Sequence, residues 1–360
     1  MVTPLRRLVW NPDEHRLRAP WRLLLGVVVV GIVVGLVSLV AGALVGLLGL
    51  GTLVTSLLGV AVGDLAGSLL GTVIAGLGFV VGIAVVGRFL DRRRFTDFGF
   101  HLGRSWWIDL GFGLALGAGL MTGIFGLGVG LGWFEITGYL VGESVFAGLA
   151  ALLVLFLFVG VYEELLVRGY LLTNVAEGLA GYVGDRGAVG VAVALSSAVF
   201  GVLHATNPNA SVVSVLTITL AGLMLALGYV LTNELAIPIG LHITWNLFQG
   251  AVYGFPVSGL PSDASLVGTR ETGPDLVTGG QFGPEAGLLG VGAILLGCVL
   301  TVQWVRWRRG VTGIHAGVTT PELRPGGNGE RDESEEKGKL EESEERDEND
   351  ESDESETSGS

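Results

Sequence analysis

Long runs of apolar residues without charge alternate along the chain with short segments that carry charged or turn-forming residues. An α-helix needs about 20 consecutive apolar residues to cross the hydrocarbon of a bilayer. The runs predict eight membrane-spanning helices, at approximately residues 23–45, 66–86, 107–131, 145–166, 188–205, 212–231, 235–255 and 286–305. We therefore expect an all-α fold, a polytopic membrane bundle of about eight transmembrane helices.

The segments between these runs complete the predicted organisation. Residues 47–62 are apolar and rich in glycine, and we interpret them as the outer half of a long first hairpin. Residues 169–186 indicate a weakly amphipathic cytoplasmic connector, and residues 256–284 an outer loop with few strand or helix signals. The sequence shows no internal repeat, no nucleotide-binding glycine pattern and no nucleic-acid motif, so we expect no nucleic-acid partner.

Arginine residues set the predicted orientation. The set around the start of the first apolar run comprises Arg6, Arg7, Arg16, Arg18 and Arg22. Residues 88–94 and 306–309 are the other dense basic segments. By the positive-inside rule, all three face the cytoplasm, which predicts a multi-pass protein of the cell membrane with both termini cytoplasmic. The first run is too long for the apolar region of a secretory signal, so we interpret it as a retained anchor.

Composition adds three points to this picture. The 60 glycines suit a membrane bundle, because small residues allow helix backbones to approach closely. The net charge of −13 lies almost entirely at the C-terminus, where residues 321–360 hold 17 acidic and 5 basic residues. We expect this low-complexity acidic tail, from about residue 318, to be disordered. The single cysteine, Cys298, excludes an internal disulfide and a multi-thiolate metal site.

Ionisable side chains inside the apolar runs are the candidates for chemistry, because the bilayer penalises each of them. Glu163 and Glu164 follow an uncharged run, and Arg168 lies four residues after Glu164, on the same helix face. We interpret Glu164 and Arg168 as a neutralising pair with a structural role. Glu163 points about 100° away and requires another partner. Of the five histidines, only His204 and His242 lie within predicted spans.

Two more side chains share a helix face with these histidines. Phe200, four residues before His204, is interpreted as a packing residue, and Asn246 lies four residues after His242. A carboxylate and an imidazole can polarise a water for attack on a carbonyl, while a second imidazole and an amide donate to the oxyanion. Alternatively, Glu163, His204 and His242 could hold a zinc ion with an open position for water. The residues permit both forms of water activation.

The stretches EELLVRGYLL, FGVLH and HITWN, in that order on successive apolar runs, resemble the three motifs of the CPBP family. This family comprises intramembrane proteases related to the CAAX prenyl endopeptidase, and it is also described as the Abi family. The resemblance covers residues 145–255 and implies that Glu163 and His204 activate the water, with His242 and Asn246 at the oxyanion. It implies an endopeptidase that cleaves a membrane-associated protein or peptide among membrane lipids, by metal-dependent or glutamate-dependent chemistry.

With this resemblance the chain divides into six expected parts. They are the basic cytoplasmic N-terminus (1–20), the N-terminal transmembrane helices (21–144), the catalytic core (145–255), an extracytoplasmic loop (256–284), the last transmembrane helix with its basic flank (285–317) and the acidic tail (318–360).

Two other functions would use the same polar residues. A proton-coupled transporter would employ them as a relay, although the sequence shows no inverted repeat or pair of interrupted helices. A catalytically silent membrane scaffold would keep them for packing. One geometric mismatch stands against hydrolysis with straight helices. Glu163 would lie near the cytoplasmic end of its span, while His204 would lie about 25 Å along the next one.

Overall fold

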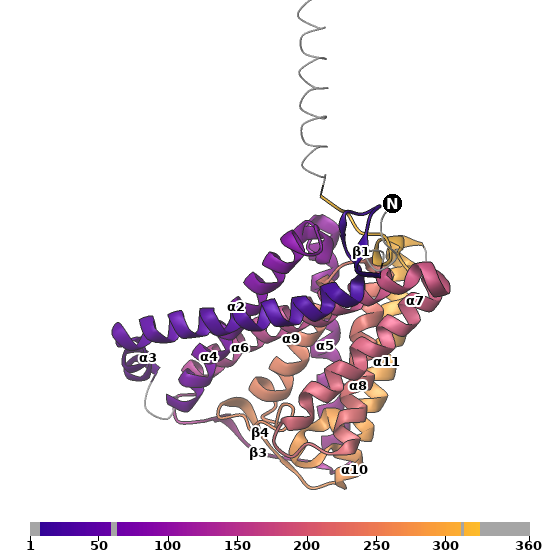
Figure 1. Cartoon of the computed structure of the whole chain (residues 1–360). Coiled ribbons are helices and arrows are strands. Elements are labelled where there is room, and N and C mark those ends of the chain that lie inside the picture. The colour runs from indigo at the N-terminus through magenta and orange to yellow at the C-terminus, as the bar shows by residue number, and fades with distance from the viewer. Residues whose placement is uncertain (1–7, 59–62, 311–312, 325–360) are drawn as a thin grey trace, which may run out of the picture.

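The computed structural model describes residues 8–58, 63–310 and 313–324, and its helices form one bundle (Figure 1). The helices are α2 (Ala19–Leu47), α3 (Leu50–Leu58), α4 (Gly63–Phe89), α5 (Arg104–Gly130), α6 (Val145–Glu164), α7 (Thr173–Leu203), α8 (Val212–Thr232), α9 (Ala236–Leu247), α10 (Asp275–Thr278) and α11 (Leu288–Arg309). Two antiparallel strand pairs join β1 (Trp10–Asn11) to β2 (Arg16–Leu17) and β3 (Phe134–Val141) to β4 (Ser265–Glu271). The predicted all-α membrane bundle is confirmed.

Within the described residues, six helical stretches are long and apolar enough to cross a membrane. The predicted fourth and fifth spans fall in one such stretch, Val145–Thr206. The predicted seventh span is the 12-residue helix α9, which continues into a π-helical turn, Phe248–Val252. The count of eight spans therefore stays a prediction.

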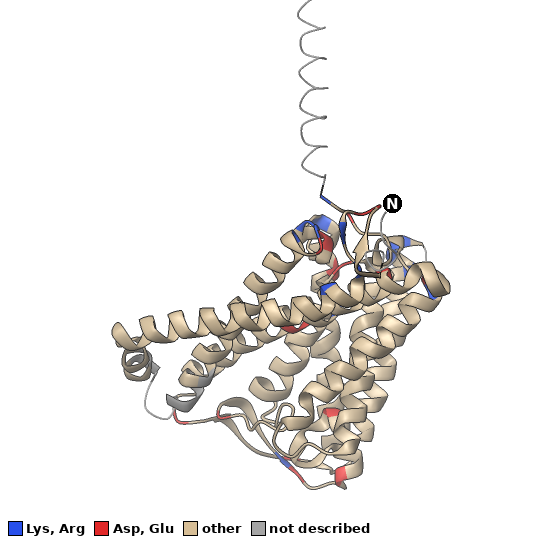
Figure 2. Cartoon of the chain, viewed as in Figure 1, with Lys and Arg blue, Asp and Glu red and all other residues tan. Residues whose placement is uncertain are grey.

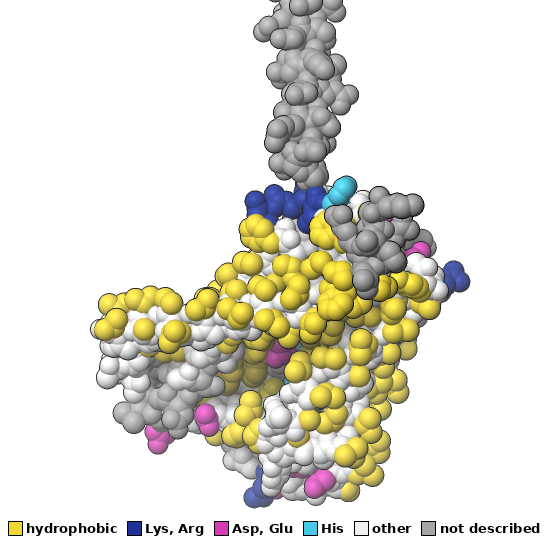
Figure 3. Space-filling model, viewed as in Figure 1, with side chains coloured by type: hydrophobic (Ala, Val, Ile, Leu, Met, Phe, Trp, Pro, Cys, Tyr) yellow, Lys and Arg dark blue, Asp and Glu magenta, His cyan; other side chains and the backbone are white. Residues whose placement is uncertain are grey.

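The helices α2 and α4 form an arm that extends away from α8 and α11 (Figure 1). The two helices touch closely, because a Cβ atom at Gly78 would lie only 2.9 Å from the Cα atom of Val34. Most side chains of α2 are exposed, and they are apolar (Figure 3). The arm thus has a largely apolar surface, which suits contact with lipid rather than with water.

Arginine residues gather at the end of the bundle where the N-terminus lies (Figure 2). Residues 313–324 pack at the same end, since the Arg324 amide donates to the Arg92 carbonyl at 2.7 Å and Arg93 forms a bridge with Leu323. The predicted disorder is therefore wrong for residues 318–324, which these backbone contacts hold. The rest of the predicted tail, 325–360, lies outside the described residues, as do residues 59–62 of the predicted first hairpin.

Residues 169–186, predicted as a weakly amphipathic cytoplasmic connector, are helical on both sides of Gly184, and their side of the membrane stays a prediction. The polar side chains of Asn174 and Glu177 are buried against the N-terminal segment. The Arg22 guanidinium donates to Asn174 at 3.1 Å and to Glu177 at 2.9 Å, and Arg16 donates to Glu177 at 3.1 Å. The partners of these buried groups lie more than 150 residues away in the sequence, so the local pattern gives no sign of them.

The helix that carries the two glutamates runs on without interruption past its predicted end. From α6 it continues as a π-helix, Leu165–Leu172, into α7, and the chain reverses at Gly184, whose φ of 70° suits glycine. Glu163 lies 21 residues before Gly184, and His204 lies 20 residues after it. The two limbs of this hairpin are thus equal in length, which removes the 25 Å mismatch expected for straight helices that end at the membrane surface.

The end of the bundle away from the N-terminus is more regular than the sequence indicates. The segment 256–284, predicted as an outer loop with few strand or helix signals, contains β4 and α10. β4 pairs with β3 from the predicted outer loop before α6, with Phe134 opposite Glu271 and Val141 opposite Ser265. The two strands are far apart in sequence, so the hydrogen bonds that define them leave no short-range signal.

Glycine allows α5 and α9 to pack in direct backbone contact. A Cβ atom on Gly113 would lie 2.4 Å from the Ile237 carbonyl oxygen, and one on Gly240 would lie 2.5 Å from the Leu110 carbonyl oxygen. Any side chain at either position would therefore clash with the backbone of the facing helix. Because α9 carries His242, this close packing also fixes the position of that histidine.

We expect Gly113→Ala to lower the free energy of unfolding by about 1–3 kcal/mol, because the added methyl group overpacks the α5–α9 contact. Gly119→Ala on the same helix is the matched control, since a Cβ atom there meets nothing within 4 Å. Chemical denaturation in detergent micelles measures both changes. Equal stability of the two variants would contradict the packing argument.

Candidate active site

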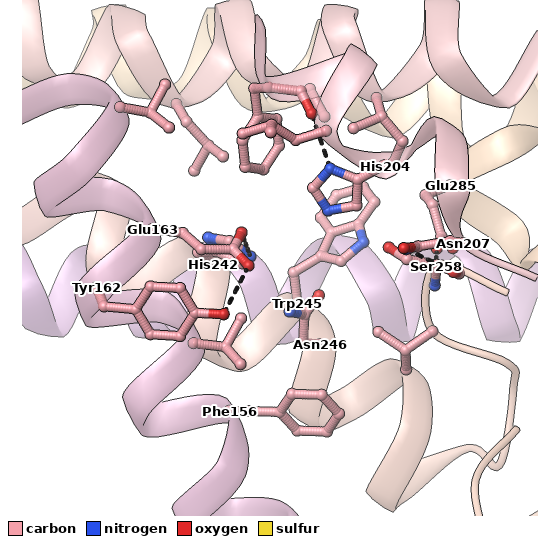
Figure 4. A pocket seen from close by; sticks show the side chains of 18 of the residues that line it. Phe156, Tyr162, Glu163, His204, Asn207, His242, Trp245, Asn246, Ser258 and Glu285 are labelled. Atoms are coloured by element: carbon pink, nitrogen blue, oxygen red, sulfur yellow. Dashed lines mark hydrogen bonds and ion pairs between the residues drawn. The ribbon is translucent and has the colours of Figure 1, made fainter. Parts of the chain in front are cut away.

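A cavity of about 440 Å³ lies between α4, α6, α7, α8 and α9. Glu163, His204, His242 and Asn246, which the sequence predicts to act together, all line this cavity (Figure 4). Figure 3 shows a hollow in the same region, between the arm of α2 and α4 on one side and helices α7 and α8 on the other, with an acidic side chain inside it. Four polar side chains from three helical segments thus share one space.

Glu164 is fully buried and connects two basic side chains. Its Oε1 atom accepts from Nη1 of Arg168 at 2.8 Å, the contact that the i,i+4 spacing predicts, and from Nδ1 of His242 at 2.8 Å. Arg168 also donates to the Gly222 carbonyl at 3.1 Å. This pair therefore joins the helix of the first motif to α8 and α9, and it fixes the orientation of the His242 ring.

Glu163 is partly exposed to the cavity, unlike its neighbour. The Tyr162 hydroxyl donates to its Oε1 atom at 3.3 Å. Its Oε2 atom lies 3.9 Å from Nε2 of His242 and has no hydrogen-bond partner among the described residues. One carboxylate oxygen is thus held by the tyrosine, and the other is a buried acceptor without a donor among the described residues.

His204 lies at the end of α7, where its Nδ1 atom contacts the Phe200 carbonyl oxygen at 2.8 Å. A carbonyl oxygen can only accept, so Nδ1 must carry the proton. In the neutral ring, Nε2 then holds a lone pair. The helix end therefore supplies the cavity with an imidazole in a defined tautomer.

Phe200 lies at the centre of the polar cluster. The Arg168 guanidinium lies 4.4 Å from its ring centroid, which is a cation–π distance. The same ring contacts His204 at 4.8 Å and His242 at 5.9 Å between centroids. Phe200 thus contacts the arginine and both imidazoles, and it packs more widely than the sequence indicates.

The donor chemistry of Glu163, His204 and His242 suits zinc, because each histidine holds Nδ1 on an oxygen and directs Nε2 elsewhere. Their placement does not suit it. Within the part of the chain that the structure describes, no three His, Cys, Asp or Glu side chains are grouped so that they could hold a metal ion. We therefore assign no step to a metal.

Several cavity residues lie outside the predicted set. Asn207, Ser258 and Glu285 form a second polar group, on the other side of His204 and Trp245 from Glu163 (Figure 4). Glu285 accepts from the Ser258 amide at 2.6 Å and is hydrogen-bonded to Gln249. A single carboxylate directly before an apolar run was the available sequence signal for Glu285, and the family motifs do not include it.

The part of the chain that carries these side chains is similar to a known protein family. Residues 144–248 match the model of the Rce1-like family, described as type II CAAX prenyl endopeptidase Rce1-like. This match covers less than a third of the chain. The resemblance inferred from the three motifs is thereby confirmed, and at family level the match supports a CAAX-type intramembrane endopeptidase in a chain with several apolar helices. No curated protein and no solved structure matches the chain.

We expect Arg168→Met to lower the free energy of unfolding by about 3–5 kcal/mol, because it leaves the buried Glu164 carboxylate without its cation. The double variant Glu164→Gln/Arg168→Met should lose less than the sum of the two single changes, since neither charge remains. Denaturation of the three variants in mixed micelles measures the coupling. Additive losses would mean that the two side chains do not stabilise each other.

Glu285 predicts a pH dependence of stability. It lies three residues before α11, and burial raises its pKa to about 7. Because the folded value exceeds the ordinary value of 4.5, the contribution of Glu285 to stability is complete below about pH 4.5 and is lost as the pH rises through 7. We expect the unfolding temperature to fall less between pH 5 and 8 in Glu285→Gln than in the wild type. Glu143→Gln, an exposed control, should behave as the wild type does.

Proposed function

We propose that this chain hydrolyses a peptide bond of a membrane-associated protein or peptide of the CAAX type, using a water activated by Glu163 and His204. The observation that carries the proposal is the pair of free acceptors in one cavity. Oε2 of Glu163 lacks a partner among the described residues, and Nε2 of His204 holds a lone pair by the argument above. A water between two such acceptors can donate to both, which is the arrangement that general-base catalysis requires.

The position of His242 supports a role at the oxyanion. Its ring lies between both carboxylates, with Nδ1 on Glu164 and Nε2 3.9 Å from Oε2 of Glu163. A proton on Nε2 would make this atom a donor for the oxyanion, and the amide of Asn246, one turn further along the helix, is the second donor.

The proposed reaction is balanced in atoms and protons. Glu163 accepts a proton from the water as its oxygen attacks the scissile carbonyl carbon. The oxyanion that forms accepts from His242 and Asn246. The carbon–nitrogen bond then breaks as Glu163 returns the proton to the leaving nitrogen, and two peptides with one new carboxyl group and one new amine result.

The distribution of arginine supports a cytoplasmic location of the end that carries both described chain ends, in a multi-pass protein of the cell membrane. The cavity would then receive substrates that are anchored in the membrane, and its lining of Phe79, Phe156 and Leu203 would contact their apolar parts.

We expect Glu163→Gln to lower kcat/KM by about 10²–10⁴-fold on a prenylated peptide in liposomes, because the base is lost. Asn246→Ala should lower kcat by about 10²–10³-fold through the loss of one oxyanion donor. Glu143→Gln on the exposed outer loop is the matched control and should retain activity. Cleavage is measured by mass spectrometry, with metal analysis and chelator treatment of the same preparation.

Other outcomes of this experiment identify the other functions. Unchanged cleavage by Glu163→Gln would refute the proposed role of the glutamate. Flux driven by a pH gradient without any cleavage would assign the polar residues to proton-coupled transport. Lower stability of Glu163→Gln, in a chain that neither cleaves nor transports, would assign them to a membrane scaffold.

A further inference from the structure

The two oxygen atoms of the Glu163 carboxylate are not equivalent. Oε1 accepts from the Tyr162 hydroxyl at 3.3 Å, whereas Oε2 has no hydrogen bond from the described residues and faces His242 at 3.9 Å. Figure 4 shows the Tyr162 hydroxyl directed at the carboxylate from one side of the cavity. A carboxylate that is free to rotate about its last bond would present either oxygen to the water. The tyrosine removes that freedom.

The ring of Tyr162 is itself held by another helix. It stacks on Phe79 of α4, with 5.3 Å between centroids and 9° between planes. Beside Phe79, Gly76 leaves room for the ring, since a Cβ atom at Gly76 would lie 3.0 Å from a ring carbon of Tyr162. Gly76 and Phe79 thus form a slot, which we call the α4 slot. It lies outside the family-matched segment 144–248.

Packing alone does not account for the hydroxyl. Phe156 and Phe158 precede Tyr162 on the same helix and pack without a polar group, and Phe156 lines the same cavity. Within α6, Tyr162 is the one aromatic residue with a hydroxyl, and it lies next to Glu163. Among the residues that the structure describes, the hydroxyl has no hydrogen-bond partner other than Glu163.

We propose that Tyr162 is a positioning residue for Glu163. Its hydroxyl fixes Oε1 and leaves Oε2 to accept the proton of the water, while the α4 slot fixes the ring. This inference rests on the proposed hydrolysis and adds to it a dependence on α4. The base of the reaction is oriented by a helix that contributes none of the four residues assigned to the chemistry.

The first test replaces the hydroxyl only. We expect Tyr162→Phe to lower kcat by about tenfold, the size of one hydrogen bond to a charged group, and to leave KM and the unfolding temperature unchanged. Tyr170→Phe is the matched control, since it removes a tyrosine hydroxyl that donates to the Arg22 carbonyl at 3.2 Å, away from the cavity. A change in KM or in unfolding temperature with an unchanged kcat would assign Tyr162 to packing and overturn the proposal.

The second test asks whether Tyr162 acts through Glu163. In a Glu163→Gln background, adding Tyr162→Phe should change the residual activity less than twofold, because the carboxylate that it orients is already absent. A further tenfold loss would overturn the proposal. If Glu163→Gln is inactive and Tyr162→Phe has wild-type kcat, positioning fails and hydrolysis stands. If both retain wild-type activity, both proposals fail.

The third test addresses the α4 slot. Gly76→Ala should displace the Tyr162 ring and lower kcat in the wild type, but it should have little effect in Tyr162→Phe, whose ring no longer holds the carboxylate. Gly71→Ala on the same helix is the control, because a Cβ atom there meets nothing within 4 Å. An equal loss for Gly76→Ala in both backgrounds would exclude the slot as the element that acts on Glu163.

Discussion

The buried carboxylate of Glu164 is the constraint on which the rest of the structure depends. A lone negative charge in this position would be strongly unfavourable, so its partners must come together whenever the chain folds. Arg168 satisfies it from the same helix and His242 from α9, and the arginine reaches on to α8. The requirement to neutralise one glutamate therefore assembles three helices. The second glutamate, Glu163, is partly exposed, and one of its carboxylate oxygens has no hydrogen bond from the described residues.

Much of the bundle could be predicted from the sequence, because the bilayer makes apolar runs and charged residues unusually informative. The cost of ionisable groups in lipid points to Glu163, His204 and His242, and the i,i+4 spacing from His242 adds Asn246; all four residues line one cavity. The sequence could not show where each helix ends. The helix that carries the glutamates continues past its predicted end, because distant residues such as Arg22 bind the polar side chains around Asn174.

The remaining differences have the same origin in long-range contacts. The pairing of β3 with β4 joins segments separated by more than 100 residues, and neither strand has a local signal strong enough to stand without the other. Glu285 and Tyr162 were missed for a related reason. Each is unremarkable in its own stretch of sequence, and only the folded chain shows that it faces the cavity. The family-matched segment supplies the proposed chemistry, while flanking helices supply much of its surroundings.

The reversal at Gly184 has a consequence for how such a chain can vary. Glu163 and His204 line one cavity because the two limbs have nearly matching lengths. A residue inserted into one limb would advance its histidine or glutamate by about 1.5 Å and rotate it by about 100°. A compensating insertion in the opposite limb, or a whole extra turn in each, would restore the arrangement. The number of residues between the first two motifs thus sets the relative position of Glu163 and His204. A change in this number would disrupt the proposed site even where every motif residue is kept.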